Sequence, residues 1–411
     1  MKTKMSHAWA ALAAASIVAG CGGGGSSSGP PPLNQSAATV TVPGIAAGSN
    51  FSFDLGVVVD GKYYLTDRNN KAVDVVDVTT LQLTQIKGTG TNAFTGVGAN
   101  TGKSGPDGIN DITGTTLLYV GDVNSVRVVD RVSGTVQSTI TVGTTGTRAD
   151  EGCYDPVHHL DMISSPDADI PFASFINTNT NTVVATVKWI DSDGNAAGGN
   201  EQCQYDPASQ SFLVNNDNTI VNPHGEVEVI PVASILALPA GSTTNFLTLA
   251  NLKRFPLGNC DPTGMDLGPG VEMAVVCRPG ATGSALTTLI LNRNTGAVIA
   301  TVPIGGGDQL AYDARTNRYY LAANRWHASG VNDQGGGCSA ANPCTPVLAV
   351  IDASTHAIAA TYATGNNAHS VAVDPVRGFV FVPFSSATAP AGCATCTANG
   401  FITGGISVFA L

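Results

Sequence analysis

The stretch FINTNTNTVVATV, residues 175–187, decides the fold, because its pattern returns along the chain. In each copy an apolar strand ends in Asp or Asn, a turn of Thr, Ser, Gly and Asn follows, and a second strand begins. The other copies are VVDVTTL (75–81), VVDRVSGTVQSTI (128–140), ILNRNTGAVIATV (290–302) and IDASTHAIAAT (351–361). Five copies in one frame indicate a chain built from internal repeats.

A second phrase precedes several of these copies. In it a strand runs into Asp-Pro or a similar turn, and an apolar strand follows. Its instances are CQYDP (203–207) before FLV (212–214), LAYD (310–313) before YYL (319–321), and SVAVDP (370–375) before FVFV (379–382). Together the two phrases make four consecutive strands, which is the pattern of one blade of a β-propeller.

The number of inner strands predicts the number of blades. Seven inner strands are expected, beginning near Asp54, Asp107, Asp150, Glu201, Asp261, Asp308 and His369. The seventh blade lacks its outer strand, and TVTVPG at residues 39–44 matches the missing piece. We therefore expect an all-β, seven-bladed propeller of four-stranded blades, closed by an N-terminal strand that leaves no open edge at the seam. A ring of six or eight blades stays open, because the fourth blade is degenerate and carries an insertion around residues 232–255.

These phrases resemble the YVTN-type repeat of bacterial surface and periplasmic propellers, a family with YncE-like and lactonase-like members. The resemblance covers roughly residues 39–411. It implies a propeller fold far more strongly than it implies an activity, because one fold serves many functions.

The N-terminus predicts export and a lipid anchor. Residues 1–20 have a basic start and a short apolar stretch, which is typical of a signal peptide and too short to span a bilayer. The small residues before Cys21 resemble the lipobox of bacterial lipoproteins, which implies acylation of Cys21. Residues 21–36 are rich in Gly, Ser and Pro and would form a tether to the propeller domain at 37–411. Because Gly22 rather than Asp follows Cys21, the expected location is the outer membrane, on its periplasmic or cell-surface side.

The charge balance excludes one class of partner. The chain has 19 Lys and Arg against 30 Asp and Glu, a net charge of −11, and removal of residues 1–20 with their two lysines makes it about −13. Such an acidic chain is a poor ligand for nucleic acid or for anionic lipid.

Cysteine usage predicts disulfides. Without Cys21, eight of the nine cysteines remain, an even number in an oxidising compartment. The pairing cannot be read from the sequence alone, but plausible pairs are Cys338 with Cys344, Cys393 with Cys396, Cys260 with Cys277, and Cys153 with Cys203. The motif at 393–396 could instead serve redox chemistry or attach haem. Thr397 stands where haem attachment needs histidine, so no haem is expected.

A second pattern, independent of the repeat phrases, is formed by ionisable residues near the start of each inner strand. Asp150, Glu201, Asp261, Asp308 and His369 each stand five residues before the turn aspartate of their inner strand, and Asp54 and Asp107 match after a one-residue slip. Every blade thus offers an ionisable group where the central channel opens. Carboxylates crowded at one mouth must protonate, stay solvated or bind a cation. We predict a divalent cation, most readily Ca²⁺, with Asp107, Asp150, Glu201, Asp261 and Asp308 as its ligands.

Loops on the same face add candidates for ligand binding. Arg325, Trp326 and His327 open the longest of these loops, and His224 follows another. A guanidinium, an aromatic ring and an imidazole together suit an organic anion. His369 is the candidate general base, because imidazole can exchange protons near neutral pH.

Three functions compete. The first is a lipid-anchored propeller that binds a metal ion, a small ligand or a protein partner at the acidic mouth. The second is a metal-assisted lactonase, hydrolase or lyase at the same mouth, in which His369 or a carboxylate would move the proton. The third is electron transfer with haem or quinone. The chain contains no phosphate-binding loop and none of the common hydrolase motifs, so no nucleotide cofactor is expected.

Overall fold

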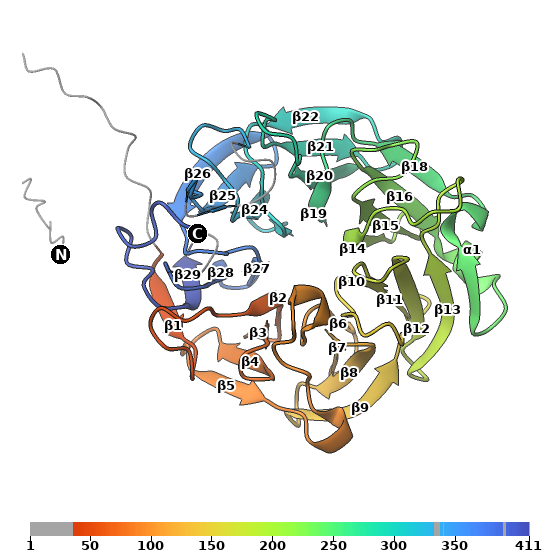
Figure 1. Ribbon diagram of the computed structural model, residues 1–411, viewed down its shortest axis with the longest axis horizontal. Coiled ribbons are helices and arrows are strands. Elements are labelled where there is room, and N and C mark those ends of the chain that lie inside the picture. Colours follow the sequence, from red (N-terminus) through yellow and green to blue (C-terminus); the bar gives the residue numbers. More distant parts are fainter. Residues whose placement is uncertain (1–35, 333–337, 340, 389–391, 411) are drawn as a thin grey trace, which may run out of the picture. The chain divides into compact units, whose positions relative to one another are not determined.

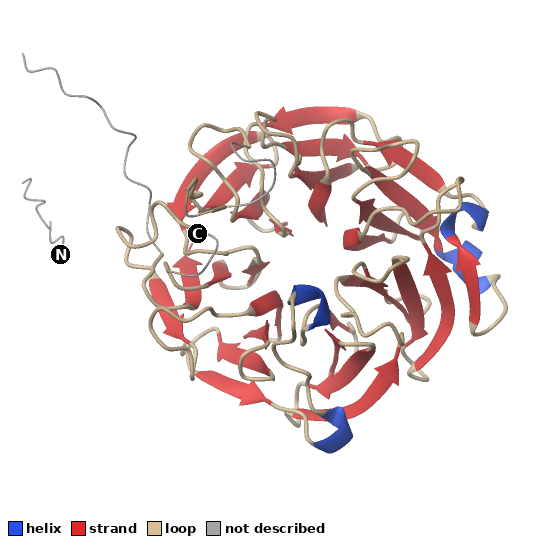
Figure 2. Ribbon diagram, viewed as in Figure 1, coloured by secondary structure: helices blue, strands red, loops and turns tan. Residues whose placement is uncertain are grey.

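A computed structural model describes residues 36–332, 338–339, 341–388 and 392–410, so the predicted signal peptide, Cys21 and most of the tether lie outside the described residues. The described residues form seven sheets, antiparallel except for one added strand, that stand side by side around a central axis (Figure 1). The prediction of seven blades is therefore confirmed. Nearly all of the regular structure is strand, and the few helical turns lie outside the sheets (Figure 2).

The first three blades follow one another along the chain, each beginning with its inner strand. Blade 1 consists of β2 (Phe53–Val59), β3 (Lys62–Asp67), β4 (Ala72–Asp77) and β5 (Leu83–Ile86). Blade 2 consists of β6 (Ile109–Asp111), β7 (Leu117–Asp122), β8 (Ser125–Asp130) and β9 (Thr135–Thr141). Blade 3 begins with β10 (Gly152–Asp155), β11 (Leu160–Ser165), β12 (Phe172–Asn177) and β13 (Thr182–Lys188). Two 3₁₀ turns, η1 (Gly90–Asn92) and η2 (Thr101–Lys103), lie between blades 1 and 2.

Blades 4 to 6 repeat the order. Blade 4 consists of β14 (Asn200–Asp206), β15 (Ser211–Asn216), β16 (Glu226–Pro231) and β18 (Lys253–Pro256). Blade 5 consists of β19 (Pro262–Leu267), β20 (Glu272–Cys277), β21 (Thr288–Asn292) and β22 (Val298–Val302). Blade 6 consists of β23 (Leu310–Asp313), β24 (Arg318–Ala323), β25 (Val347–Asp352) and β26 (Ala357–Ala363).

The seventh blade joins the two ends of the ring. Its inner three strands are β27 (Ala372–Val373), β28 (Phe379–Phe384) and β29 (Gly405–Ala410). The outer strand is β1 (Ala38–Thr41), which pairs antiparallel with β29 so that Thr39 faces Ser407 and Val40 faces Ile406. The N-terminal segment thus closes the ring, as the sequence predicted.

The insertion in blade 4 changes the expected strand count. It holds the one-turn helix α1 (Val232–Leu236), strand β17 (Ser242–Asn245) and the 3₁₀ turn η3 (Phe246–Thr248). Strand β17 pairs in parallel with β13, so blade 3 has five strands rather than four. Strand β17 forms backbone hydrogen bonds with the outer strand of blade 3, so the groups at this edge are paired. No helix among the described residues has the length and apolar character needed to cross a membrane.

The repeated aspartates and asparagines terminate strands. The side chain of Asp130 accepts hydrogen bonds from the backbone N–H groups of Val132 (2.8 Å) and Ser133 (2.9 Å). The same two bonds form at Asp77, Asn177 and Asp352, and the first of them, from Asn294, forms at Asn292. Such turns satisfy backbone donors locally and reverse the chain between the third and fourth strands. The repeat phrase is therefore a turn signal with a physical cause.

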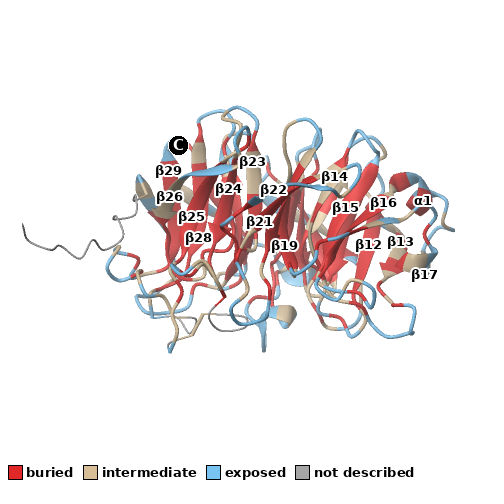
Figure 3. Ribbon diagram, turned by 90° about the horizontal axis from the view of Figure 1, so that it is seen from above, coloured by how far each residue is buried: buried red, intermediate tan, exposed pale blue. Residues whose placement is uncertain are grey.

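The hydrophobic core lies between neighbouring blades. One cluster joins blades 7 and 1 through Val40, Phe53, Tyr63 and Phe381, and the other clusters likewise span two blades. The second and third strands of the blades are buried along most of their length, while outer strands such as β9 and β22 and the turns at both ends of the sheets are more exposed (Figure 3). The inner strand of each blade lies nearest the central axis (Figure 1).

All four plausible disulfides are present. Cys153 and Cys203 join the inner strands of blades 3 and 4, and Cys260 pairs with Cys277 within blade 5. Cys338–Cys344 and Cys393–Cys396 each close a short loop, in blades 6 and 7 respectively.

Candidate ligand-binding pocket at the channel mouth

The ionisable residues predicted for the mouth lie at one level of the ring. Asp54 and Glu201 are the second residues of their inner strands, and the others stand one to three residues before theirs. The loops that follow the second strand of each blade open on the same face. The structure divides these residues into two groups with different surroundings.

The first group is neutralised by arginines. Arg68, which directly follows β3, donates through Nε to Asp107 (2.7 Å) and pairs with Asp54 (3.0 Å). Arg148 pairs with Asp150 (2.7 Å) and with Asp167 (2.7 Å). We call Asp54, Arg68, Asp107, Arg148 and Asp150 the charge layer. Because the guanidinium groups occupy the space between the carboxylates, this half of the mouth is an internal ion-pair network.

Burial controls protonation in the charge layer. It raises the pKa of Asp107 to about 7, against the opposing pull of Arg68, and holds the pKa of Asp150 well above its ordinary range. The pKa of Asp54 is lowered instead: burial opposes ionisation, but Arg68, Arg148 and the hydrogen bond with His369 outweigh it. Within the charge layer, burial therefore favours the protonated form of Asp107 and Asp150, and the paired arginines favour the charged form.

His369 belongs to the same network. Its Nδ1 donates to the carbonyl oxygen of Asn367 (2.8 Å), and its Nε2 lies 3.3 Å from Asp54 Oδ1. The ring stacks on Phe53 with centroids 4.7 Å apart and is almost entirely buried. Both ring nitrogens thus have protein partners, and the imidazole lies outside the set of residues that line the pocket described next. This arrangement does not support the predicted role as general base.

The second group surrounds a pocket of about 590 Å³ on the same face. Its polar lining includes Asp217, His224, Asp261, Arg278 and Arg325, from the loops of blades 4, 5 and 6. Two of the predicted ligand-binding residues, His224 and Arg325, are thereby brought together, although 101 positions separate them in the chain.

The Cys260–Cys277 disulfide holds the backbone of the pocket wall. Asp261 directly follows Cys260, and Arg278 directly follows Cys277. The backbone N–H of Arg278 donates to the carbonyl of Cys260 (2.8 Å), and that of Asp261 donates to the carbonyl of His224 (2.8 Å). A cross-linked wall of this kind reduces the conformational freedom that a ligand would have to restrict.

Among the described residues, Arg325 has no carboxylate at ion-pair distance, and one oxygen of Asp217 has no hydrogen-bond partner. Arg278 lies 3.9 Å from Asp308, and His224 lies 3.5 Å from Asp261, but no carboxylate among the described residues is within ion-pair distance of Arg325. Likewise, Oδ1 of Asp217 is buried with no hydrogen-bond partner in the described part of the chain. A guanidinium and a carboxylate oxygen thus line one pocket without pairing with each other.

The surroundings shift the pKa values of these two groups. Burial, and then the neighbouring Arg278 guanidinium, lower the pKa of Arg325 to about 10, so Arg325 stays charged at pH 7. Burial raises the pKa of Asp217 to about 6. Beside the pocket, burial and the Asp217 carboxylate raise the pKa of Glu201 to about 8. Near neutral pH the pocket therefore presents charges of both signs.

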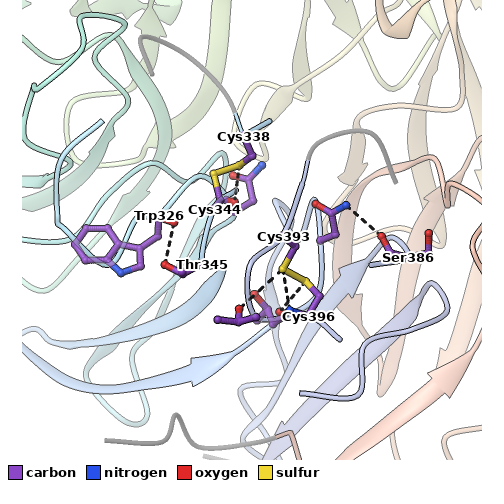
Figure 4. Close-up of a disulfide and its surroundings, with 11 residues drawn as sticks. Trp326, Cys338, Cys344, Thr345, Ser386, Cys393 and Cys396 are labelled. Atoms are coloured by element: carbon purple, nitrogen blue, oxygen red, sulfur yellow. Dashed lines mark hydrogen bonds between the residues drawn. A yellow bond between two sulfur atoms is a disulfide. The ribbon is translucent and has the colours of Figure 1, made fainter. Parts of the chain in front are cut away.

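Trp326 and His327 do not line this pocket. His327 is buried, with Nε2 3.5 Å from Cys344 Sγ, and the carbonyl of Trp326 accepts from Thr345 N (2.8 Å) and Oγ1 (3.2 Å). Figure 4 shows Trp326 beside the Cys338–Cys344 disulfide, with the Cys393–Cys396 disulfide next to it. A backbone hydrogen bond from Ala394 to Cys344 (2.8 Å) joins the two disulfide loops. These residues stabilise the loop that carries Arg325.

The five predicted metal ligands do not converge. Asp107 and Asp150 belong to the charge layer, whereas Asp261 lines the pocket beside the His224 imidazole, and Asp308 lies 3.9 Å from the Arg278 guanidinium. Within the described ranges, no three His, Cys, Asp or Glu side chains gather as a metal site requires. The cation stays a prediction of the sequence.

Sequence reasoning missed three arginines: Arg68, Arg148 and Arg278. A positional signal existed, because Arg68 and Arg278 directly follow the second strands β3 and β20, and Arg325 comes two residues after β24. The same end of the second strand in three blades therefore delivers a guanidinium to the mouth.

Comparisons with known proteins support the fold alone. No family model matches the chain, and no curated protein matches it. Among solved structures, it is similar to hydrazine synthase of Kuenenia stuttgartiensis, with TM-score 0.60, 14% identity, and coverage of 90% of this chain and 99% of that one. A chain of the mitotic checkpoint complex gives TM-score 0.56, 12% identity, and coverage of 90% and 95%. The WD40 propeller domain of Doa1 gives 0.51, 10%, and coverage of 82% and 93%.

Proposed function

We propose that this chain is a binding protein whose pocket at the channel mouth takes a small zwitterionic ligand, such as an amino acid or a short peptide. The observation that carries the proposal is the unpaired Arg325 guanidinium in the same pocket as the unpaired Asp217 carboxylate oxygen. A buried polar atom usually has a partner, and Asp217 Oδ1 has none among the described residues. Together with the half-buried Arg325 guanidinium in the same pocket, it marks a place for a ligand that carries both charges.

The chemistry of the ligand follows from the two groups. A carboxylate on the ligand would accept hydrogen bonds from Arg325, and the neighbouring Arg278 would share its charge. An ammonium group would donate to Asp217. An anion without an ammonium group would meet the unpaired oxygen of Asp217, which disfavours it relative to a zwitterion. A pocket of about 590 Å³ is within the size range of small-molecule sites.

The proposal includes the membrane anchor predicted from the sequence. Acylation of Cys21 would hold the propeller on the outer membrane, where the pocket meets solutes of the periplasm or the cell surface. In the native host, Cys21→Ser should remove acyl labelling and move the protein from the membrane fraction to the soluble fraction. Retention of the variant in the membrane fraction would contradict the anchor without bearing on the pocket.

The test of the pocket uses matched ligands. Thermal shift and calorimetry are measured with a panel of free amino acids and dipeptides, and alanine is compared with propionate, which lacks the ammonium, and ethylammonium, which lacks the carboxylate. We expect at least one zwitterion of the panel to bind, and each half-ligand to bind more weakly than alanine. A panel without any binder, or propionate binding as tightly as alanine, would overturn the proposal.

Variants assign the two charges. Arg325→Gln and Asp217→Asn should each weaken binding of the best zwitterion by about 10- to 100-fold, as the loss of a charge-assisted hydrogen bond predicts. Arg315→Gln is the matched control, because Arg315 is exposed in a hairpin after the inner strand of blade 6, on the other side of the ring. An affinity unchanged by both pocket variants would place the ligand elsewhere.

A further inference from the structure

A second cavity, of about 410 Å³, occupies the central channel. Residues from all seven inner strands line it, and it shares no lining residue with the mouth pocket. Its lining runs from Glu151 and Gln309, where β10 and β23 begin, to Thr113 and Pro156 in the hairpins where the inner strands of blades 2 and 3 end. The cavity therefore reaches the hairpin side of the ring, opposite the mouth.

Glu151 lies at the inner end of this cavity and has an unused oxygen. The residue is 4% exposed, and its Oε2 has no hydrogen-bond partner in the described part of the protein. On the same wall, the side-chain oxygen of Gln202 accepts from Met265 N (2.7 Å), and that of Gln309 accepts from Ser370 Oγ (2.6 Å). These amides connect neighbouring blades. The carboxyl oxygen of Glu151 remains free to accept from a ligand.

The electric field at Glu151 favours a cation. The ionisable neighbours that act on it most strongly are all acidic: Asp54, Asp150, Glu201 and Asp308. Burial, and after it these carboxylates, raise the pKa of Glu151 well above its ordinary range, which favours the protonated form in the free protein. A cation bound beside it would reverse this effect and release the proton.

The walls of the cavity decide which kind of cation fits. Beyond Glu151 the lining is mixed: it has apolar residues such as Val57 and Leu310 and the rings of Tyr154 and Tyr312, together with polar groups that include Asp266. Apolar and aromatic walls suit an alkylammonium ion, because they contact its carbon chain and attract its charge. A hard metal ion requires several oxygen ligands, and no set of three acidic, His or Cys side chains in the described segments provides them.

We propose that the channel binds a small primary alkylammonium ion, with its ammonium group hydrogen-bonded to the Glu151 carboxylate and its chain against the apolar wall. The Glu151 proton leaves to solvent as the ammonium enters, so the charge in the cavity balances. This site is independent of the mouth pocket and does not rest on the function proposed above.

Calorimetry with n-butylammonium chloride tests the site. Titrations at pH 7 in two buffers of different ionisation enthalpy give both the affinity and the protons released. We expect binding with release of a proton, and at least tenfold weaker binding of n-butanol, the neutral ligand of the same shape. Equal affinity for n-butanol, or no heat and no thermal shift up to millimolar amine, would overturn the proposal.

Three variants make the result specific. Glu151→Gln keeps the shape of the side chain and should reduce amine affinity at least tenfold and abolish the proton release. Glu228→Gln neutralises another buried carboxyl, one that accepts from Trp189 Nε1 away from both cavities, and should leave amine binding unchanged. Asp217→Asn should also leave it unchanged. If Asp217→Asn abolishes the binding and Glu151→Gln does not, the amine binds at the mouth and the channel site is wrong.

Discussion

Aspartate serves two purposes in each blade, and its surroundings decide which. Asp77, Asp130 and Asp352 stand in exposed turns, where backbone N–H groups donate to them and lower their pKa. Asp107 and Asp150 stand at the mouth, where burial raises their pKa instead. Aspartate therefore ends a strand in the turns, where its charged form is solvated. At the mouth it holds its proton more tightly, because burial disfavours the charged form.

Asp217 should make zwitterion binding pH-dependent. Its pKa is raised to about 6, so at pH 5 it is mostly protonated and cannot pair with a ligand ammonium. We expect affinity to rise as the pH increases from 5 to 7.5, by about tenfold if the ion pair is worth about 1.4 kcal/mol. Calorimetric titrations of the ligand between pH 5 and pH 7.5 measure this change in affinity.

Asp217→Asn is the matched control for this effect and should bind weakly with a flat profile. His224→Gln separates any contribution of the imidazole in the same pocket. A wild-type affinity that falls as the pH rises would contradict the assignment of Asp217 to the ammonium group.

At the scale of elements, the ring depends on the short strand β1. Val40 on this strand is buried in the cluster between blades 7 and 1, whereas its neighbour Thr39 is exposed. The strand contributes four residue pairs to β29. It closes the ring with a segment that comes from the other end of the chain.

Val40→Asp should destabilise the protein strongly. A carboxylate in this apolar cluster would have no partner there, so we expect a loss of about 3 kcal/mol or more in the free energy of unfolding. Thr39→Asp, on the solvent side of the same strand, should change it by less than about 1 kcal/mol. Urea denaturation measures the free energy of unfolding of both variants. Similar midpoints would mean that the pairing of β1 does not stabilise the closed ring.

The disulfides should differ in how much they stabilise the folded protein, according to the length of the loops they close. Cys153–Cys203 spans 50 residues and joins two blades, whereas Cys393–Cys396 spans three. Loop-closure entropy predicts a stabilisation of about 4 kcal/mol for the first and about 2 kcal/mol for the second. Double alanine variants of each pair, compared by denaturation, should preserve this order. An equal loss in both would show that local packing, not chain entropy, sets the value.

For the whole molecule, the raised pKa values at the mouth predict a loss of stability with pH. Asp107 and Glu201 have folded-state pKa values of about 7 and about 8, above those of an unfolded chain. Folding therefore takes up protons, and stability present at mildly acid pH is lost as the pH rises toward 8. The slope is about 1.4 kcal/mol per pH unit for each proton taken up.

Glu201→Gln tests this expectation, because glutamine cannot ionise. Its melting temperature should fall less than that of the wild type between pH 5.5 and pH 8.5. Asp193→Asn is the control, since Asp193 is exposed in a loop of the mouth face and should leave the wild-type slope intact. A wild-type stability that rises across this range would mean that the mouth carboxylates are ionised in the folded protein.

The architecture could be predicted from the sequence because it depends on local patterns. The side chains of Asp130, Asn177 and Asn292 accept hydrogen bonds from backbone groups two residues further on. Each copy of the repeat therefore predicts its hairpin from local sequence alone. The ring count and the closing strand follow from that period, whereas the disulfide pairs could only be named as plausible. The level of the mouth residues follows as well, because every inner strand begins there.

What happens at the mouth was decided only by the tertiary structure. Carboxylates on one level predicted a cation, but loops of unequal length bring Arg68 and Arg148 between Asp54, Asp107 and Asp150. His224 and Arg325 meet in one pocket, while Trp326 and His327, next to Arg325 in the chain, do not join them. The physical reason is that charge pairing depends on distance across the ring, and a repeat determines where strands begin but not where the side chains of the loops end.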